Sequence, residues 1–250
     1  MMPHAAQWAI GFAFAFLCGS IPFGLLIARA RGVDIRAHGS GNVGATNVLR
    51  VLGPRAGALC FALDVLKGAL PIALIGVWTG AMSDRALGPG DAALWLFAAA
   101  CAPIGHMYSP WIGFKGGKGV ATGFGAMLGL YPHLTLPALL AFALFLASLR
   151  VTRYVGVSSC VAAASIPLWF TILRLLWPGD AGESPGERLA AGWPFIAATA
   201  ALAALVVWRH RSNIGRTLNG TEMRIGERIR VEPQQRPITG DDDGAVPPSR

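Results

Sequence analysis

The chain of 250 residues is 54% hydrophobic and only 14% charged, and it contains 32 glycines. Soluble domains carry about 25% charged residues, so this composition argues against an ordinary soluble enzyme. It also excludes disorder over most of the length. The high glycine content fits membrane helices, which tolerate glycine. The net charge of +8 suits an anionic lipid or an anionic substrate, but no basic face with interleaved aromatics supports nucleic-acid binding.

Six apolar runs follow one another along the chain, and most of them approach the roughly 20 residues needed to cross a bilayer. They are Trp8–Ile27, Ala56–Gly80, Ala92–Met107, Val120–Leu149, Val155–Trp177 and Ala191–Trp208. The first run is preceded by no Lys or Arg and followed by Arg29 and Arg31. This polarity predicts an uncleaved span whose N-terminus lies outside the cell.

The run Val120–Leu149 is long and contains Pro132 and Pro137, so it fits either one tilted helix or two helices joined near Tyr131–Leu134. With two helices, almost all Lys and Arg residues share one side of the membrane, and the other side keeps only Arg85 and Arg188. The positive-inside rule therefore favours two helices. We predict an all-α integral membrane protein with seven transmembrane helices, an outside N-terminus and a cytoplasmic C-terminus.

Two charged residues, Asp64 and Lys67, lie inside the second run and three positions apart, hence on one helical face. Charges within a membrane span are functional candidates, although a structural ion pair explains them equally well. The four cysteines each lie in an apolar run without a CxxC pair. We therefore predict no metal site and no cofactor.

The polar C-terminal segment sets the predicted domain boundary. Residues 1–217 form one polytopic membrane domain, and residues 218–250 form a polar cytoplasmic tail that is disordered from about Val231.

Three predicted cytoplasmic segments, Gly32–Arg50, Gly105–Gly119 and Arg209–Arg216, combine glycines with cations and neutral donors. Glycine amides form concave nests for anions, and Lys and Arg pair with phosphate. The stretch Gly39–Arg50 offers several hydroxyl and amide side chains and no acidic residue. These features indicate an anion site, although simple connectors between spans also contain glycine.

Familiar catalytic and nucleotide-binding motifs do not explain these segments. Gly39–Gly44 fits GxGxxG but lacks the surrounding βαβ unit, and Gly116–Gly119 lacks both the first Gly and the final Ser or Thr of a Walker A motif. No GxSxG or HExxH pattern is present. Among the histidines, His210 is the best functional candidate because Asn213 follows it in a basic segment.

Taken in order, five motifs resemble those of the bacterial membrane acyl-phosphate:glycerol-3-phosphate acyltransferases. They are Gly19–Gly24, Gly39–Asn47 with Arg50, Asp64–Gly68, Gly116–Thr122 and His210–Gly215. The resemblance implies an inner-membrane enzyme whose active site faces the cytoplasm. It implies transfer of a fatty acyl group from acyl phosphate to the 1-hydroxyl of glycerol 3-phosphate, giving lysophosphatidic acid and phosphate in the first acylation of phospholipid synthesis.

The resemblance also implies roles for individual residues. It implies that Ser40, Gly41, Asn42, Thr46 and Asn47 hold a phosphate opposite Gly116, Gly117 and Lys118, and that glycerol 3-phosphate meets Arg50, Lys118, His210 and Asn213. A family serine is replaced here by Gly156, which leaves Ser159 or Ser158 as the substitute. The expected catalytic residues are Ser40, Asn42, Lys118, His210 and Asn213.

Two other classes of function also account for the glycines and cations. A membrane carrier for a small phosphorylated anion would place its polar groups near the bilayer midplane, whereas here they lie in cytoplasmic connections, which favours an enzyme. A non-catalytic lipid-binding scaffold is the third alternative. The expected partners are acyl phosphate, glycerol 3-phosphate and the lipid bilayer, and the oligomeric state is not predicted.

Overall fold

The computed structural model describes residues 4–83, 87–176 and 183–227 and contains no strand within those ranges. Arg85 and the segment predicted to be disordered from about Val231 lie outside the described residues. The α-helices are α1 (His4–Ser20), α2 (Phe23–Arg29), α3 (Ala45–Leu52), α4 (Pro54–Thr79), α5 (Pro89–Met107), α6 (Val120–Gly129), α7 (Thr135–Thr152), α8 (Val155–Leu176), α9 (Pro185–Arg209) and α10 (Arg211–Leu218). Two 3-10 turns, η1 (Ile35–Ala37) and η2 (Pro110–Ile112), complete the described elements.

Six helical segments in the described ranges are long and apolar enough to cross a membrane, and they correspond to the predicted apolar runs. The all-helical prediction is therefore confirmed. The run Val120–Leu149 is divided into α6 and α7, with the chain reversing between Leu130 and Leu134. The ten residues of α6 extend only about 15 Å, about half the hydrocarbon thickness of a bilayer.

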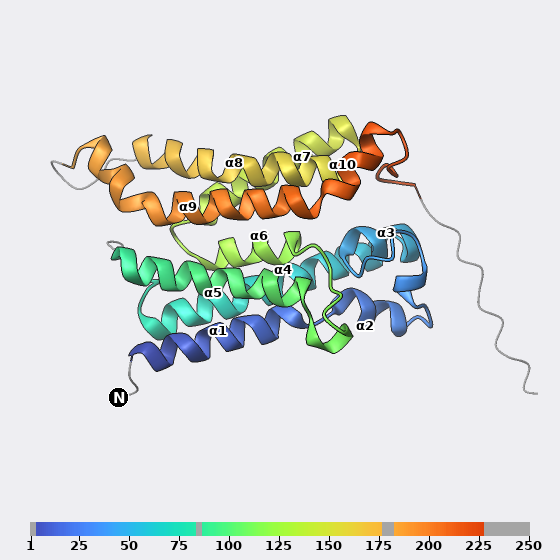
Figure 1. The fold of residues 1–250 in the computed structure, drawn as a ribbon, viewed down its shortest axis with the longest axis horizontal. Helices are drawn as coiled ribbons and strands as arrows, with labels where there is room; N and C mark the ends of the chain where they lie inside the picture. The colour runs from blue at the N-terminus through green and yellow to red at the C-terminus, as the bar shows by residue number, and fades with distance from the viewer. Residues whose placement is uncertain (1–3, 84–86, 177–182, 228–250) are drawn as a thin grey trace, which may run out of the picture.

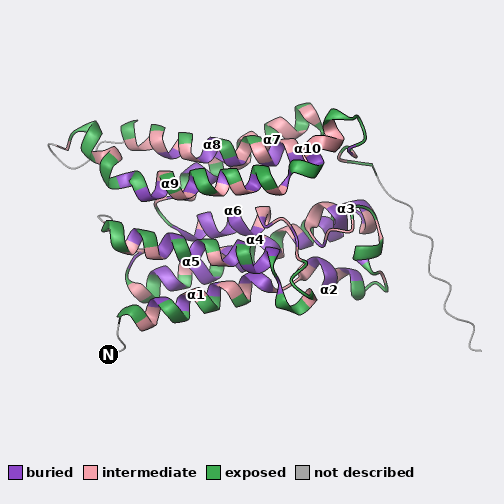
Figure 2. Cartoon of the chain, viewed as in Figure 1, coloured by how far each residue is buried: buried purple, intermediate pink, exposed green. Residues whose placement is uncertain are grey.

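The helices form two layers that meet at α6 (Figure 1). One layer contains α7, α8 and α9, and the other contains α1, α4 and α5. The short helices α2, α3 and α10 gather at one end of the bundle. Large apolar side chains such as Leu70, Leu74 and Leu168 are exposed, and Figure 2 shows such exposed positions along the long helices. An apolar exterior of this kind fits a multi-pass membrane protein.

Glycines allow α4 and α6 to pack closely. A Cβ atom at Gly68 would overlap the carbonyl oxygen of Thr122, and one at Gly125 would overlap that of Val65. Small residues permit this backbone approach between membrane helices. The close packing at Gly68 and Gly125 thus fixes α6 against α4.

The first apolar run is broken at Pro22, which the apolar pattern alone did not predict. Proline has no N–H to continue the helix, and carbonyl groups at the break accept hydrogen bonds from side chains. Lys67 donates from Nζ to the Ile21 carbonyl oxygen at 2.7 Å, and Ser109 donates to the Ser20 carbonyl oxygen at 2.6 Å. Lys67 also pairs with Asp64, at 2.7 Å. The intramembrane ion pair therefore has a structural role at the break between α1 and α2.

Candidate functional site

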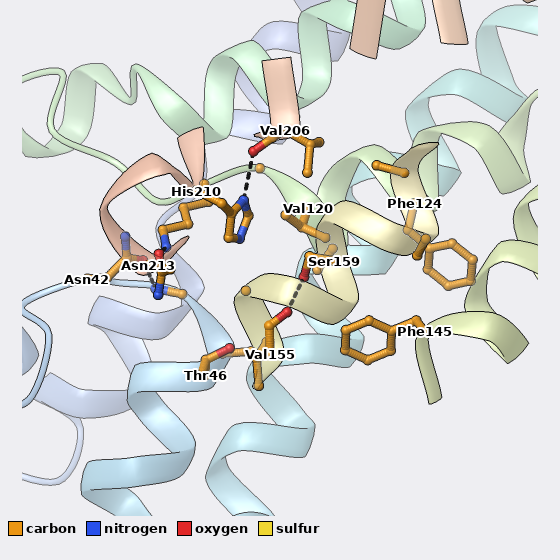
Figure 3. Close-up of a pocket in the computed structure, with 18 of the residues that line it drawn as sticks. Asn42, Thr46, Val120, Phe124, Phe145, Val155, Ser159, Val206, His210 and Asn213 are labelled. Atoms are coloured by element: carbon orange, nitrogen blue, oxygen red, sulfur yellow. Dashed lines mark hydrogen bonds between the residues drawn. The ribbon is translucent and has the colours of Figure 1, made fainter. Parts of the chain in front are cut away.

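A cavity of about 560 Å³ opens where the two layers meet at the end that carries α3 and α10. Its lining includes residues of α3, α4, α6, α7, α8, α9 and α10. Figure 3 draws lining residues from several of these elements, with Asn42, Thr46, His210 and Asn213 toward the left of the view and Ser159 to their right. All three polar segments singled out in the sequence contribute side chains to this one cavity.

The loop before α3 is shaped by two asparagines. The Asn47 side chain accepts from the Ser40 N–H at 3.0 Å and donates to the carbonyl oxygens of Ile35 and His38. Asn42 accepts from the Gly44 N–H at 2.8 Å, where α3 begins. These bonds occupy the Asn47 amide within the fold, while Ser40 and Thr46 line the cavity. Asn47 therefore positions the loop.

The loop before α6 presents Lys118 to the cavity. The Gly116 and Gly117 N–H groups donate to the carbonyl oxygens of Met107 and His106, at 3.0 and 3.1 Å. The Gly117 carbonyl oxygen accepts from Arg209 at 2.7 Å. Because both N–H groups already have partners, they are not donors to a bound anion in this structure. Their hydrogen bonds instead fix the backbone from which Lys118 extends.

Lys118 and Asn213 are in direct contact through Nζ and Oδ1. Burial, together with the neighbouring cations Arg216, Arg209 and Arg50, lowers the pKa of Lys118 to about 8, against an opposing effect of Glu222. Lys118 is therefore mainly protonated at neutral pH.

His210 lies where α9 ends and is buried. Its Nδ1 is 2.8 Å from the Val206 carbonyl oxygen, which puts the proton on Nδ1 and leaves Nε2 as an acceptor. Burial and the nearby Lys118 lower the pKa of His210 to about 4. The imidazole is thus neutral at physiological pH.

Glu222 connects the cations of the site, although the sequence analysis assigned it to the polar tail. Its Oε2 accepts from Arg216 Nε at 2.7 Å, and its Oε1 accepts from Asn213 Nδ2 at 2.8 Å. Arg50 Nη2 lies 3.5 Å from the same Oε1 and donates to the Met223 carbonyl oxygen at 2.8 Å. Burial alone would raise the pKa of Glu222, but the hydrogen bonds and charges of these neighbours hold it below its ordinary value.

The charge balance of the cavity lining is positive. Among the described lining residues, the cations are Arg50, Lys118 and Arg216, and the acids are Asp64 and Glu222. Asp64 is paired with Lys67, which leaves three cations against one carboxylate. The Arg50 Nε atom is buried and has no hydrogen-bond partner within the described residues. An excess of two positive charges and a free guanidinium donor suit a phosphate group.

The start of α8 distinguishes Ser158 from Ser159. Ser159 lines the cavity and donates back to the Val155 carbonyl oxygen at 2.8 Å, as drawn in Figure 3. Ser158 is not part of the lining, and it donates to the Tyr154 carbonyl oxygen. A Cβ atom at Gly156 would lie only 2.8 Å from Asn213 Cβ. Gly156 thus allows α8 to approach the helix that carries Asn213, and Ser159 is the serine that faces the cavity.

The inner part of the cavity is apolar. Its wall is formed by side chains of α4, α6, α7, α8 and α9, among them Phe61, Phe124, Phe142, Ala163 and Val206. Phe124 and Phe142 stack with ring centroids 4.9 Å apart. This one cavity therefore has a cationic end, beside α3 and α10, and an apolar interior between the helices.

Most of the residues predicted to form the site lie together in this cavity. Those that line it are Ser40, Asn42, Thr46, Asn47, Arg50, Lys118, Ser159, His210 and Asn213. Gly41, Gly116 and Gly117 do not line it. Glu222 was not predicted to belong to the site, and its signal in the sequence is an acidic residue just after a strongly basic segment.

Comparison with known proteins reveals relatives over most of the chain. Residues 9–220 match a protein family described as glycerol-3-phosphate acyltransferase. A glycerol-3-phosphate acyltransferase of Thermosynechococcus vestitus is 41% identical over 85% of this chain and 92% of its own length. One of Geobacter sulfurreducens is 42% identical over 85% of this chain and 95% of its own length.

Two solved structures are also similar to this chain. They are crystal structures of PlsY (YgiH), an integral membrane glycerol 3-phosphate acyltransferase, in its glycerol 3-phosphate and lysophosphatidic acid forms. The first is 38% identical with a TM-score of 0.70, and the second is 37% identical with a TM-score of 0.69. Each comparison covers 88% of this chain and 96% of the PlsY chain.

The lowered pKa of Lys118 predicts how anion binding depends on pH. Anion affinity should be constant below pH 8 and fall above it, by up to about tenfold per pH unit, because Lys118 loses its charge near pH 8. Sulfate is the suitable probe because its charge does not change in this range. The measurement is the rise in melting temperature that sulfate produces in the purified protein. In a Lys118→Arg variant, which stays charged, the effect of sulfate should no longer depend on pH. If the pH dependence is unchanged in this variant, a group other than Lys118 causes it.

Proposed function

This chain belongs to the glycerol-3-phosphate acyltransferase family, and we propose that its acyl donor is an acyl phosphate. The products are then 1-acyl-glycerol 3-phosphate and inorganic phosphate. The observation that carries this proposal is the single cavity with a cationic end and an apolar interior. An acyl phosphate has the same division, with a charged phosphate at one end and an alkyl chain at the other.

The acceptor occupies the side of the cationic end formed by Arg50, Lys118 and α10. Its phosphate pairs with Arg50 Nε, which has no partner within the described residues, and with the Lys118 ammonium. His210 Nε2 accepts a hydrogen bond from a glycerol hydroxyl, since Nδ1 is bonded to Val206. Asn213 positions Lys118 and shares Glu222 with Arg50.

The donor phosphate lies against the loop before α3, where Ser40, Asn42 and Thr46 supply neutral donors. Asn47 shapes that loop, and the hydrogen bonds of Gly116 and Gly117 orient Lys118. Ser159 lies between the polar and apolar parts of the cavity, beside the donor carbonyl. The acyl chain extends into the apolar interior.

Transfer occurs in one chemical step without an acyl-enzyme. The 1-hydroxyl oxygen of glycerol 3-phosphate attacks the acyl carbonyl carbon, the new C–O bond forms, and the bond from that carbon to the phosphate oxygen breaks. The hydroxyl proton passes to the departing phosphate, because a histidine whose pKa is about 4 is a weak base at neutral pH. Protonated Lys118 stabilises the charge that develops on the phosphate. The protein thus contributes orientation and fixed charge.

A transfer assay on the purified protein in detergent tests the donor. The assay combines labelled glycerol 3-phosphate with acyl phosphate or acyl-CoA in parallel. We expect labelled lysophosphatidic acid with acyl phosphate and background levels with acyl-CoA. Product formation without sealed compartments also excludes a carrier, and efficient transfer from acyl-CoA alone would contradict the proposed donor.

Two variants control this assay. Lys118→Ala should lose at least about a hundredfold in turnover, the magnitude typical of an electrostatic stabiliser, whereas Lys115→Ala, an exposed lysine of the same loop, should stay near wild type. A cysteine-free variant should remain active; trapped acyl-protein in the wild type would refute direct transfer.

For the membrane orientation, we propose seven passes, with α6 and its connection to α7 counted as one of them. The N-terminus is then outside, and the site faces the cytoplasm at the inner membrane. The side of the cationic cavity carries Lys115 in a connection and Arg55 and Arg150 at helix ends. The opposite side carries Glu183 in a connection and Glu187 and Asp91 at helix ends. This distribution follows the positive-inside rule.

Cysteine labelling in intact cells tests this orientation. Single cysteines in the cysteine-free background replace the exposed residues Gly88, Lys115, Ser184 and Leu218. A membrane-impermeant maleimide should label the variants at 88 and 184 in intact cells, and those at 115 and 218 only after permeabilisation. Labelling at 218 together with protection at 184 would indicate a single crossing between Lys118 and Arg150 and would contradict the proposal.

A further inference from the structure

A second cavity, of about 70 Å³, lies between α5, α6 and α9, on the far side of the apolar interior. Three residues, Gly123, Met127 and Leu202, line both this small cavity and the large one. They therefore form the partition between the two spaces.

Gly123 differs from the packing glycines of the same helix. Cβ atoms at Gly125 and Gly129 would overlap the backbone of α4, but at Gly123 the nearest atom to such a Cβ is Pro103 Cβ, at 3.9 Å. Helix packing does not require glycine there, and glycine is a poorer helix former than alanine. Its missing side chain leaves open space beside the partition.

The remainder of the partition is flexible and apolar. Met127 lies four residues after Gly123 and hence on the same face of α6. Its unbranched side chain adapts to irregular space. Leu202 of α9 lines the same two cavities. The hydroxyl of Thr199, which also lines the small cavity, is bonded to the Phe195 carbonyl oxygen at 2.7 Å, so the cavity offers an apolar environment.

The partition is well separated from the reacting groups. Along α6, Met127 lies about 10 Å beyond Val120, and along α9, Leu202 lies about 12 Å from His210, at 1.5 Å per residue. An acyl chain whose carbonyl lies at the cationic end, with its tail directed inward, meets the partition with its methyl end.

We propose that the small cavity is the terminal subsite for the methyl end of the acyl chain, and that Gly123, Met127 and Leu202 set the longest chain that the enzyme accepts. This inference rests on the proposed acyl-phosphate function. A donor whose chain ends before the partition needs no rearrangement, while a longer donor displaces the Met127 side chain and enters the small cavity.

The test is the chain-length profile of kcat/KM, measured with a homologous series of saturated acyl phosphates. Gly123→Leu should fill the space beside the partition and lose activity selectively with the longer donors. Met127→Ala should open the partition and shift the optimum to longer donors. Each methylene gained or lost from the site should change kcat/KM by about fourfold, since its burial contributes about 0.8 kcal/mol. The Cβ atom added in Gly123→Ala meets no close atom. This variant should also lose activity with the longer donors, but less than Gly123→Leu.

Leu128→Ala is the matched control, because Leu128 is the neighbour of Met127 on α6 and lines neither cavity. It should keep the wild-type profile. Equal losses at every chain length in Gly123→Leu, or an unshifted optimum in Met127→Ala, would overturn the proposal. A wild-type enzyme inactive with every acyl phosphate would refute the proposed function instead, so the two failures are distinguishable.

Discussion

The carboxylate of Glu222 is the interaction on which the cationic end of the cavity depends. It is buried among groups from distant parts of the chain, namely Arg50 of α3 and Asn213 and Arg216 of α10. Asn213 in turn contacts Lys118. Like charges brought together in a partly desolvated space repel strongly, and one buried, hydrogen-bonded carboxylate offsets part of that repulsion. Because two positive charges remain in excess after this pairing, the groups are held together and the cavity lining keeps a net positive charge.

The second constraint is the place of this site in the bundle. The cations lie at the end of the helices, and the apolar wall continues inward between the two layers. Close contacts such as those at Gly68 and Gly125 hold α6 against α4, so α6 forms a fixed wall on the inner side. A molecule with one charged end and one alkyl end therefore fits in one direction, with its charged end among the cations. The bond between its charged part and its alkyl part then lies at the boundary between the two environments.

Much of the fold could be predicted from the sequence, because apolar runs and the distribution of arginine reflect the bilayer directly. The break at Pro22 could not, since hydropathy gives the extent of a run and not its path. In the site, composition indicated the segments that contain Arg50, Lys118 and the hydroxyl and amide residues, while the roles of the individual residues came from the family resemblance and stay predictions. The N–H groups of Gly116 and Gly117 were expected to face an anion, but tertiary contacts gave them carbonyl partners. Glu222 looked like part of a polar tail until the fold brought it beside Arg50.

A double-mutant cycle on the binding of glycerol 3-phosphate tests the central claim most directly. The measurement is the dissociation constant, by calorimetry, for the wild type, Arg50→Met, Lys118→Met and the double variant, each checked for an unchanged melting temperature. If Arg50 and Lys118, from separate segments, bind one phosphate, each single change weakens binding and the two effects are coupled by about 0.5–3 kcal/mol. Effects that add within about 0.3 kcal/mol, or a single change that leaves the affinity unaltered, would contradict a shared anion site.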